Sequence, residues 1–159
     1  MILTYTLVID KPLNMKKKYI LDKLNFVLSS NKGWKKHGYN FKYIDTVENC
    51  DIIVHMSTNA FINKRCGVGD KLSCAEYYKN IKNKGNIYLN VERWRKGSPA
   101  SKLNLQDYRN YQLNHEFGHI LGRDHVFHKD YINKKCPIMV QQTLGIGQSK
   151  RNCWPLDFE

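Results

Sequence analysis

Three histidines, one glutamate and two glycines lie between positions 115 and 125, and this run constrains the fold more than any other part of the chain. His115 and His119 are four residues apart, so on an α-helix they lie one turn apart on the same face and can bind one ion. Glu116 follows the first of them and can reach a water at that ion without binding the ion itself. The run therefore predicts a helix that carries a metal centre.

The helix is expected to end near Gly122, three residues after His119. Glycine tolerates a positive φ, which allows a sharp turn that brings His125 back as the third ligand. Three histidines leave the fourth position of a tetrahedral Zn²⁺ open for water, whose pKa the ion lowers to about 7. An open position is typical of catalytic zinc. We therefore expect one catalytic zinc ion, with Glu116 as the general base.

The alternative interpretation of this run is a helix whose histidines only cap or pack. Phe117, Ile120 and Leu121 already supply an apolar face, so the core needs no imidazole for its packing. The metal-ligand interpretation is therefore preferred.

The order H-E-x-x-H-x-x-G-x-x-H resembles the signature of the metzincin clan of zinc peptidases. The clan also has a methionine-containing turn downstream, the Met-turn, and Pro137-Ile138-Met139 is similar to it. In the clan this methionine forms an apolar floor beneath the zinc, which makes Met139 the candidate here; an ordinary core methionine is the alternative. The resemblance implies a zinc endopeptidase, a hydrolase that binds an extended peptide or protein segment along the edge of a sheet.

A second resemblance, over about residues 50 to 155, is to a bacterial metzincin-like family of unknown function. It rests on Cys66 with Leu72-Ser73-Cys74, Asn90-Val91-Glu92-Arg93-Trp94, Tyr108-Arg109, Tyr111, Asn114-His115-Glu116, Gln141-Gln142-Thr143 and Cys153-Trp154-Pro155. The residue after the third histidine is Val126, which does not match the Glu of astacins or the Asp of adamalysins. The segment 127–135 and the N-terminal half also depart from the family.

The chain is long enough for one domain with a single core. Hydrophobic periodicity predicts strands at 2–9, 41–44, 51–56 and 86–91, an amphipathic helix at 15–28 and the metal helix at about 105–121. We also expect an antiparallel edge strand somewhere between Asn59 and Glu76. The prediction is an α+β, metzincin-like domain, with a mixed twisted sheet backed by one helix and fronted by the metal helix. Its N-terminal subdomain covers about 1–122, and a short irregular C-terminal subdomain with the Met-turn covers about 123–159.

The chain is basic, with a formal net charge of +12. The positive charge is densest at Lys16-Lys17-Lys18 and around Lys32, Lys35 and Lys36. A solvated face is the preferred interpretation over nucleic-acid binding, because no helix-turn-helix, zinc knuckle or aromatic-basic RNA motif accompanies the charge. No apolar run is long enough for a membrane span, and the protein is expected to be a soluble monomer.

Five cysteines cannot all pair within one chain. Cys66 with Cys74 would close a short loop, and Cys136 with Cys153 would join the Met-turn segment to the C-terminal residues; the family resemblance implies at least the first pair. Cys50 is then left over. Disulfides favour secretion, an oxidising compartment or a virion over the cytosol, although the chain as given carries no export signal. Five reduced thiols in the cytosol are the alternative.

Three side chains are considered as stabilisers of an oxyanion, namely Tyr111, His128 and Tyr131, and the spacing selects none of them. Asp124 could orient a ligand histidine or be an exposed acid. A different class of function is also consistent with the sequence: a catalytically silent or gated zinc-containing protein that uses its basic surface to dock on nucleic acid, a capsid or an acidic partner.

Overall fold

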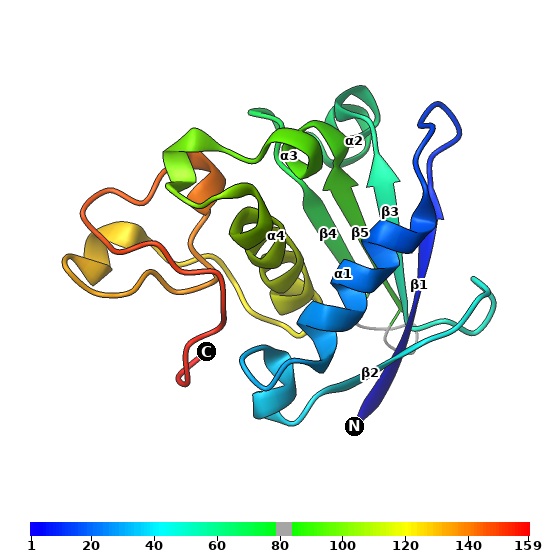
Figure 1. Cartoon of the computed structure of the whole chain (residues 1–159), viewed down its shortest axis with the longest axis horizontal. Helices are drawn as coiled ribbons and strands as arrows, with labels where there is room; N and C mark the ends of the chain where they lie inside the picture. The colour runs from blue at the N-terminus through cyan, green and yellow to red at the C-terminus, as the bar shows by residue number, and fades with distance from the viewer. Residues whose placement is uncertain (79–83) are drawn as a thin grey trace.

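The computed structural model describes residues 1–78 and 84–159 (Figure 1). In chain order its strands and helices are β1 (Ile2–Ile9), α1 (Lys17–Ser29), β2 (Asn40–Tyr43), β3 (Ile52–Ser57), α2 (Asn59–Cys66), β4 (Cys74–Tyr78), β5 (Lys84–Asn90), α3 (Val91–Lys96) and α4 (Leu105–Ile120). Short 3₁₀ helices lie at Trp34–His37, Pro99–Ser101, His128–Tyr131 and Gln142–Leu144. The chain forms a single mixed α/β domain.

The five strands form one mixed sheet in the order β2-β1-β3-β5-β4. The pairs β1–β2, β1–β3 and β3–β5 are parallel, whereas β4 pairs antiparallel with β5 and forms one edge of the sheet. Alternate residues of β3, namely Ile52, Val54 and Met56, are fully buried on one face. This alternation is the period of two that sequence patterning predicts for a strand.

The helices α1 and α4 lie side by side on the same face of the sheet (Figure 1). From α1, Leu24 and Val27 join the apolar core beneath β1, and from α4 the ring of Phe117 meets that of Phe41 on β2, with centroids 5.3 Å apart. The prediction of one helix behind the sheet and the other in front is therefore wrong in this respect. Parallel strands place their connecting helices on a face, and both helices share one core here.

Helix α4 is deeply buried and passes close to the sheet at its C-terminal end. A Cβ atom placed on Gly85 of β5 would lie 2.5 Å from Cδ1 of Ile120. The glycine therefore lets the last turn of α4 approach the strand, which brings the end of the helix next to β4 and β5.

The predicted strands 2–9, 41–44, 51–56 and 86–91 and the helices 15–28 and 105–121 are confirmed, with small differences at their ends. The antiparallel edge strand is also present, as β4, but most of the window given for it forms α2 and a loop instead. The short helices α2 and α3 were not predicted. Thr58 and Asn90 accept hydrogen bonds from Phe61 N and Glu92 N and begin these two helices.

The residues after α4 form an irregular segment that folds back along it. A small second cluster of buried side chains, Cys136, Val140 and Ile146, lies in this segment. A bridge between Val126 and Val140 joins its beginning to the predicted Met-turn. None of the helices in the described part of the chain combines the length and the apolar character that a membrane crossing needs.

Candidate metal centre

Helix α4 carries the first two predicted ligands and ends where the sequence predicts. At its start Asn104 accepts a hydrogen bond from Asp107 N at 2.8 Å. At its end Gly122 has a φ of +90°, while Gly122 N and Arg123 N donate to the carbonyls of His119 and Gly118. These two bonds form a Schellman motif, which needs a residue in the left-handed region. The turn reverses the chain and brings the following residues back over the last turn of the helix.

The three predicted ligand histidines converge on one point. Nε2 of His125 lies 3.2 Å from Nε2 of His115 and 3.0 Å from Nε2 of His119. In a tetrahedral site with metal–nitrogen distances of 2.0–2.1 Å, two ligand nitrogens are about 3.3 Å apart. The three imidazoles could therefore hold a metal ion, and within the residues that the structure describes they form the one such group of three His, Cys, Asp or Glu side chains.

Backbone carbonyls fix the orientation of two of the rings. Nδ1 of His115 donates to the carbonyl oxygen of Ile138 at 2.8 Å, and Nδ1 of His119 donates to that of Arg123 at 2.9 Å. Because Nδ1 carries the proton in both rings, each Nε2 presents a lone pair to the shared point. Lone pairs that face one another at this distance favour a cation between them, and the donor set therefore fits a bound metal.

Burial keeps the imidazoles neutral. Burial, together with the neighbouring His119, lowers the pKa of His115 to about 3, and burial also lowers the pKa values of His119 and His125. Neutral imidazole is the form that binds a metal, since the protonated ring has no free lone pair. The site is therefore ready to accept a cation at neutral pH.

Glu116 is buried on the same helix and lines the same cleft as the three histidines. Its Oε2 has no hydrogen-bond partner, although it is shielded from solvent. Burial raises the pKa of Glu116 to about 8. An unpartnered buried carboxylate oxygen is costly unless a cation, a water or a substrate meets it, so this atom indicates a group that binds in the cleft.

The cleft has a volume of about 440 Å³ and runs between α4 and the sheet edge at β4. Its walls besides the histidines and Glu116 include Val68, Leu72, Tyr77, Tyr108, Gln141 and Thr143. One wall thus comes from the loop 67–73 and strand β4, and the opposite wall comes from the residues that follow the predicted Met-turn.

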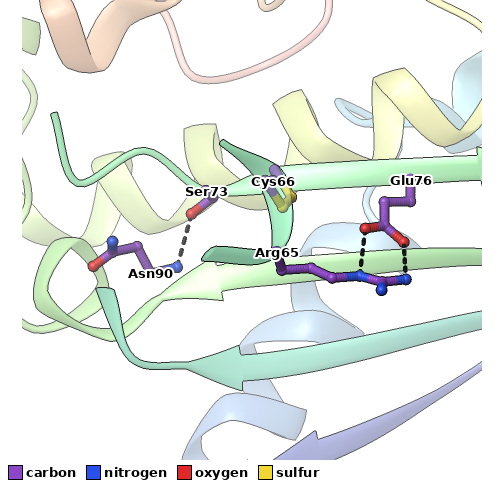
Figure 2. Close-up of a disulfide and its surroundings, with 6 residues drawn as sticks. Arg65, Cys66, Ser73, Glu76 and Asn90 are labelled. Carbon is purple, nitrogen blue, oxygen red and sulfur yellow. Dashed lines mark hydrogen bonds and ion pairs between the residues drawn. A yellow bond between two sulfur atoms is a disulfide. The ribbon is translucent and has the colours of Figure 1, made fainter. Parts of the chain in front are cut away.

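A disulfide between Cys66 and Cys74 closes the loop 67–73, as the family resemblance implies. It joins the end of α2 to the first residue of β4 (Figure 2). Beside it, Nε and Nη2 of Arg65 donate to the two carboxylate oxygens of Glu76 at 2.8 and 3.0 Å. The disulfide is compatible with an oxidising compartment.

The loop is also held at Ser73. Its Oγ accepts a hydrogen bond from Asn90 N at 2.8 Å (Figure 2). It also accepts one from Nε2 of Gln112 at 2.7 Å. The first partner lies at the end of β5 and the second lies on α4, so one hydroxyl fixes the cleft wall to both elements.

The second predicted disulfide is not formed. Cys136 and Cys153 are both free and buried, as is Cys50, so the structure does not bring the predicted pair together. Burial raises the pKa of the Cys136 and Cys153 thiols to about 11, which keeps them protonated and unreactive at neutral pH.

Met139 packs directly beneath α4 and is 2 % exposed. A Cβ atom on Gly118 would lie 2.5 Å from Sδ of Met139 and 2.9 Å from Cζ2 of Trp34. The methionine therefore packs against α4 at Gly118. Gly118 was missed by the sequence analysis, although a glycine inside a helix is itself a signal of close packing.

The remaining predicted side chains lie in different surroundings. The hydroxyl of Tyr111 accepts from Gln142 N and donates to the Val140 carbonyl, and the ring of Tyr131 stacks on Phe158. His128 is exposed and packs against Gly147. Asp124 is exposed and lines the cleft. The backbone carbonyl of Arg123, instead of this carboxylate, accepts the hydrogen bond from Nδ1 of His119.

Comparison with known proteins gives one family. A family model described as "Protein of unknown function (DUF3152)" matches residues 2–158. No match to a curated protein was found. A solved structure described as the GM1 bound form of the ECX AB5 holotoxin is similar with 14% sequence identity and a TM-score of 0.45, over 91% of this chain and 69% of that chain.

Proposed function

Since the chain belongs to the family described as "Protein of unknown function (DUF3152)", whose description assigns no activity, we propose its function from the site itself. The proposal is a zinc-dependent endopeptidase that hydrolyses peptide bonds. One observation carries it: three neutral imidazoles converge with their Nε2 atoms 3.0 and 3.2 Å apart, beside the buried and unpartnered carboxylate of Glu116. The resemblance of this run to the metzincin signature supports zinc as the ion and peptide hydrolysis as the reaction.

In this proposal the three histidines bind the metal ion and Glu116 transfers a proton. Zinc held by His115, His119 and His125 would supply a Lewis acid that polarises a carbonyl and makes water a stronger acid. Burial favours the protonated form of Glu116, and the positive charge of a bound ion would favour the ionised form. The ionised carboxylate accepts the proton of the attacking water and then donates it to the nitrogen of the leaving amine. Its burial excludes bulk water, which strengthens its interaction with a charge that develops nearby.

Strand β4 supports the binding of an extended peptide. It is the last strand on its side of the sheet, and among the described residues its second edge pairs with no other strand. Cys74, Ala75 and Tyr77 of this strand line the cleft. A peptide that adds to this edge would place one of its carbonyls beside the three imidazoles.

The test is cleavage of a peptide library by zinc-loaded protein, with the new termini identified by mass spectrometry. We expect cuts by the wild-type protein, and a loss of about 10²- to 10⁴-fold in rate for Glu116→Gln and Glu116→Ala, because proton transfer by a positioned carboxylate contributes about this much. Both variants should still bind one zinc ion. The matched control is Glu48→Gln, an exposed carboxylate in a turn, which should cleave at the wild-type rate.

Two outcomes contradict the proposal. If Glu116→Gln cleaves as fast as the wild-type protein, Glu116 is not the general base. If the wild-type protein binds one zinc ion and cuts nothing, the catalytically silent or gated binding protein is the better account. The Cys66–Cys74 disulfide favours an oxidising environment.

A further inference from the structure

The side chain of Glu159 binds three backbone amides. Oε2 accepts hydrogen bonds from Ile138 N at 3.0 Å and from Leu156 N at 2.7 Å, and Oε1 accepts one from Met139 N at 3.0 Å. Two of these donors, Ile138 and Met139, belong to the predicted Met-turn. A carboxylate that accepts several backbone N–H bonds holds that backbone more firmly than a neutral acceptor does.

Through Ile138 this carboxylate is connected to His115. The N–H of Ile138 donates a hydrogen bond to Glu159, and the carbonyl of Ile138 accepts one from Nδ1 of His115 at 2.8 Å. The position of that carbonyl sets the direction of the imidazole ring. Glu159 therefore restrains the group that orients the first ligand.

Through Arg123 the same residue is connected to His119. Nε of Arg123 donates to the backbone oxygen of Glu159 at 2.8 Å, and the guanidinium lies over the rings of Trp34 and Tyr39. The backbone carbonyl of Arg123 accepts a hydrogen bond from Nδ1 of His119 at 2.9 Å. Both carbonyls that orient the helical ligands thus belong to residues that Glu159 contacts.

The third ligand is connected through Met139. Its N–H binds Glu159, and its carbonyl accepts a hydrogen bond from Val126 N at 3.2 Å, in the residue directly after His125. The three histidines come from α4 and from the segment that follows it. Each of them is connected to Glu159 through hydrogen bonds of an intermediate residue.

We propose that Glu159 is a positioning residue of the metal centre, which fixes the rings of His115, His119 and His125 through Ile138, Arg123 and Met139. The inference rests on the metal centre of the proposed function and goes beyond it, because neither the zinc-ligand pattern nor peptide hydrolysis requires this residue. Groups that orient metal ligands typically change the affinity for the metal by about 10- to 100-fold when they are removed.

The experiment measures zinc affinity of the folded protein by competition with a chelator, at a temperature well below the unfolding midpoint of every variant. Glu159→Ala removes the carboxylate that binds the Ile138 and Met139 amides but keeps the backbone oxygen that binds Arg123. We expect the loss of the carboxylate to weaken zinc binding by about 10- to 100-fold. Glu159→Gln turns an NH₂ group toward a backbone N–H but retains one acceptor oxygen. Because of that oxygen, the loss of zinc affinity should be smaller for Glu159→Gln than for Glu159→Ala. The matched control is Asp157→Asn, a nearby exposed carboxylate that pairs with Lys36, which should bind zinc as the wild-type protein does.

A second measurement separates positioning from a merely structural role. Co²⁺ is loaded in place of zinc, and its visible absorption bands report the geometry of the ligand atoms. Glu159→Ala should shift or broaden these bands, and Asp157→Asn should not. If Glu159→Ala lowers the unfolding temperature but leaves the zinc affinity and the Co²⁺ bands unchanged, the inference is wrong and the proposed function is unaffected. If the wild-type protein binds no zinc at all, the metal centre and this inference are both overturned.

Discussion

At the scale of single residues, Gly118 decides how closely the floor of the site approaches the metal helix. Met139 and Trp34 fill the space beside this glycine, and the methyl group of an alanine there would clash with both side chains. Alanine is the better helix former by about 1 kcal/mol, so the glycine costs helix stability that the packing beneath it must offset. The stability of a Gly118 variant therefore depends on whether helix propensity or packing has the larger effect.

We expect Gly118→Ala to lower the free energy of unfolding by about 1 to 2 kcal/mol. Overpacking of a filled core costs about 1 to 3 kcal/mol and here exceeds the gain in helix propensity, because both neighbours are buried side chains with little room to move. Urea unfolding of the metal-free protein measures the change. Gly69→Ala is the control, since a Cβ atom there meets no heavy atom within 4 Å. A variant at position 118 as stable as the wild-type protein would show that Met139 does not pack under the helix.

At the scale of elements, the disulfide loop 67–73 and strand β4 form one wall of the cleft. The disulfide fixes both ends of the loop, and Ser73 fixes its last residue to β5 and α4. Arg93 adds a further bond, from Nη2 to the carbonyl of Asp70 at 2.8 Å. The wall therefore depends on a few bonds made by a short segment, not on a large apolar interface.

Removal of this disulfide should lower stability and weaken the proposed substrate binding. For Cys66→Ser combined with Cys74→Ser, which are eight residues apart, we expect a loss of about 2 to 3 kcal/mol from the greater chain entropy of the unfolded state. A higher KM with a smaller change in kcat should follow, because the loop lines the cleft but carries no ligand.

Urea unfolding and steady-state kinetics with and without a reductant measure both effects. A reductant should destabilise the wild-type protein and leave the double variant unchanged. An equal response of the two proteins would mean that the bond between Cys66 and Cys74 does not restrain the loop.

Local patterns predicted most of the elements and the three histidines that converge. His115 and His119 follow from their spacing on a helix, and Gly122 and His125 from the turn that a glycine permits. The carbonyls of Ile138 and Arg123 could not be found in this way, because every residue has a carbonyl and only the fold selects two of them. Glu159 was missed for a related reason, since Ile138 and Met139 lie 21 and 20 positions earlier and no periodicity links them to it.

The arrangement of layers was harder to predict than the elements themselves. The periodicity of α1 shows that the helix has one apolar face, through Ile20, Leu24, Val27 and Leu28, but it does not say which side of the sheet that face meets. The short helices α2 and α3 were missed because six to eight residues are too few for a period to be recognised. Their capping residues, Thr58 and Asn90, were the local signal available.

At the scale of the whole molecule, a bound metal should stabilise the fold, because the three ligands join the end of α4 to the segment that follows it. A ligand at 100 times its dissociation constant adds about 2.7 kcal/mol. In a chain of this length that corresponds to a rise in Tm of about 5 to 10 °C.

We therefore expect excess zinc to raise Tm by about that amount relative to protein kept metal-free with a chelator. His125→Ala should lose most of the shift, because it removes one of the three proposed ligands. His125 is the most exposed of the three, so its removal disturbs the core least. His128→Ala, an exposed histidine three residues further on, should keep it. Thermal unfolding followed by circular dichroism measures the shift. An equal zinc response in wild type and His125→Ala would mean that the ion binds elsewhere.

The order of these contacts along the chain has a consequence for biosynthesis. The three histidines leave the ribosome before Ile138, whose carbonyl orients His115, and well before Glu159, which binds the Ile138 and Met139 amides. At about 5 to 20 residues per second, the ribosome needs a few seconds to make the intervening chain. During that interval the nascent protein has its ligands but lacks the backbone that aligns them. In the proposed centre, the alignment of the ligands by Glu159 therefore follows the translation of residue 159.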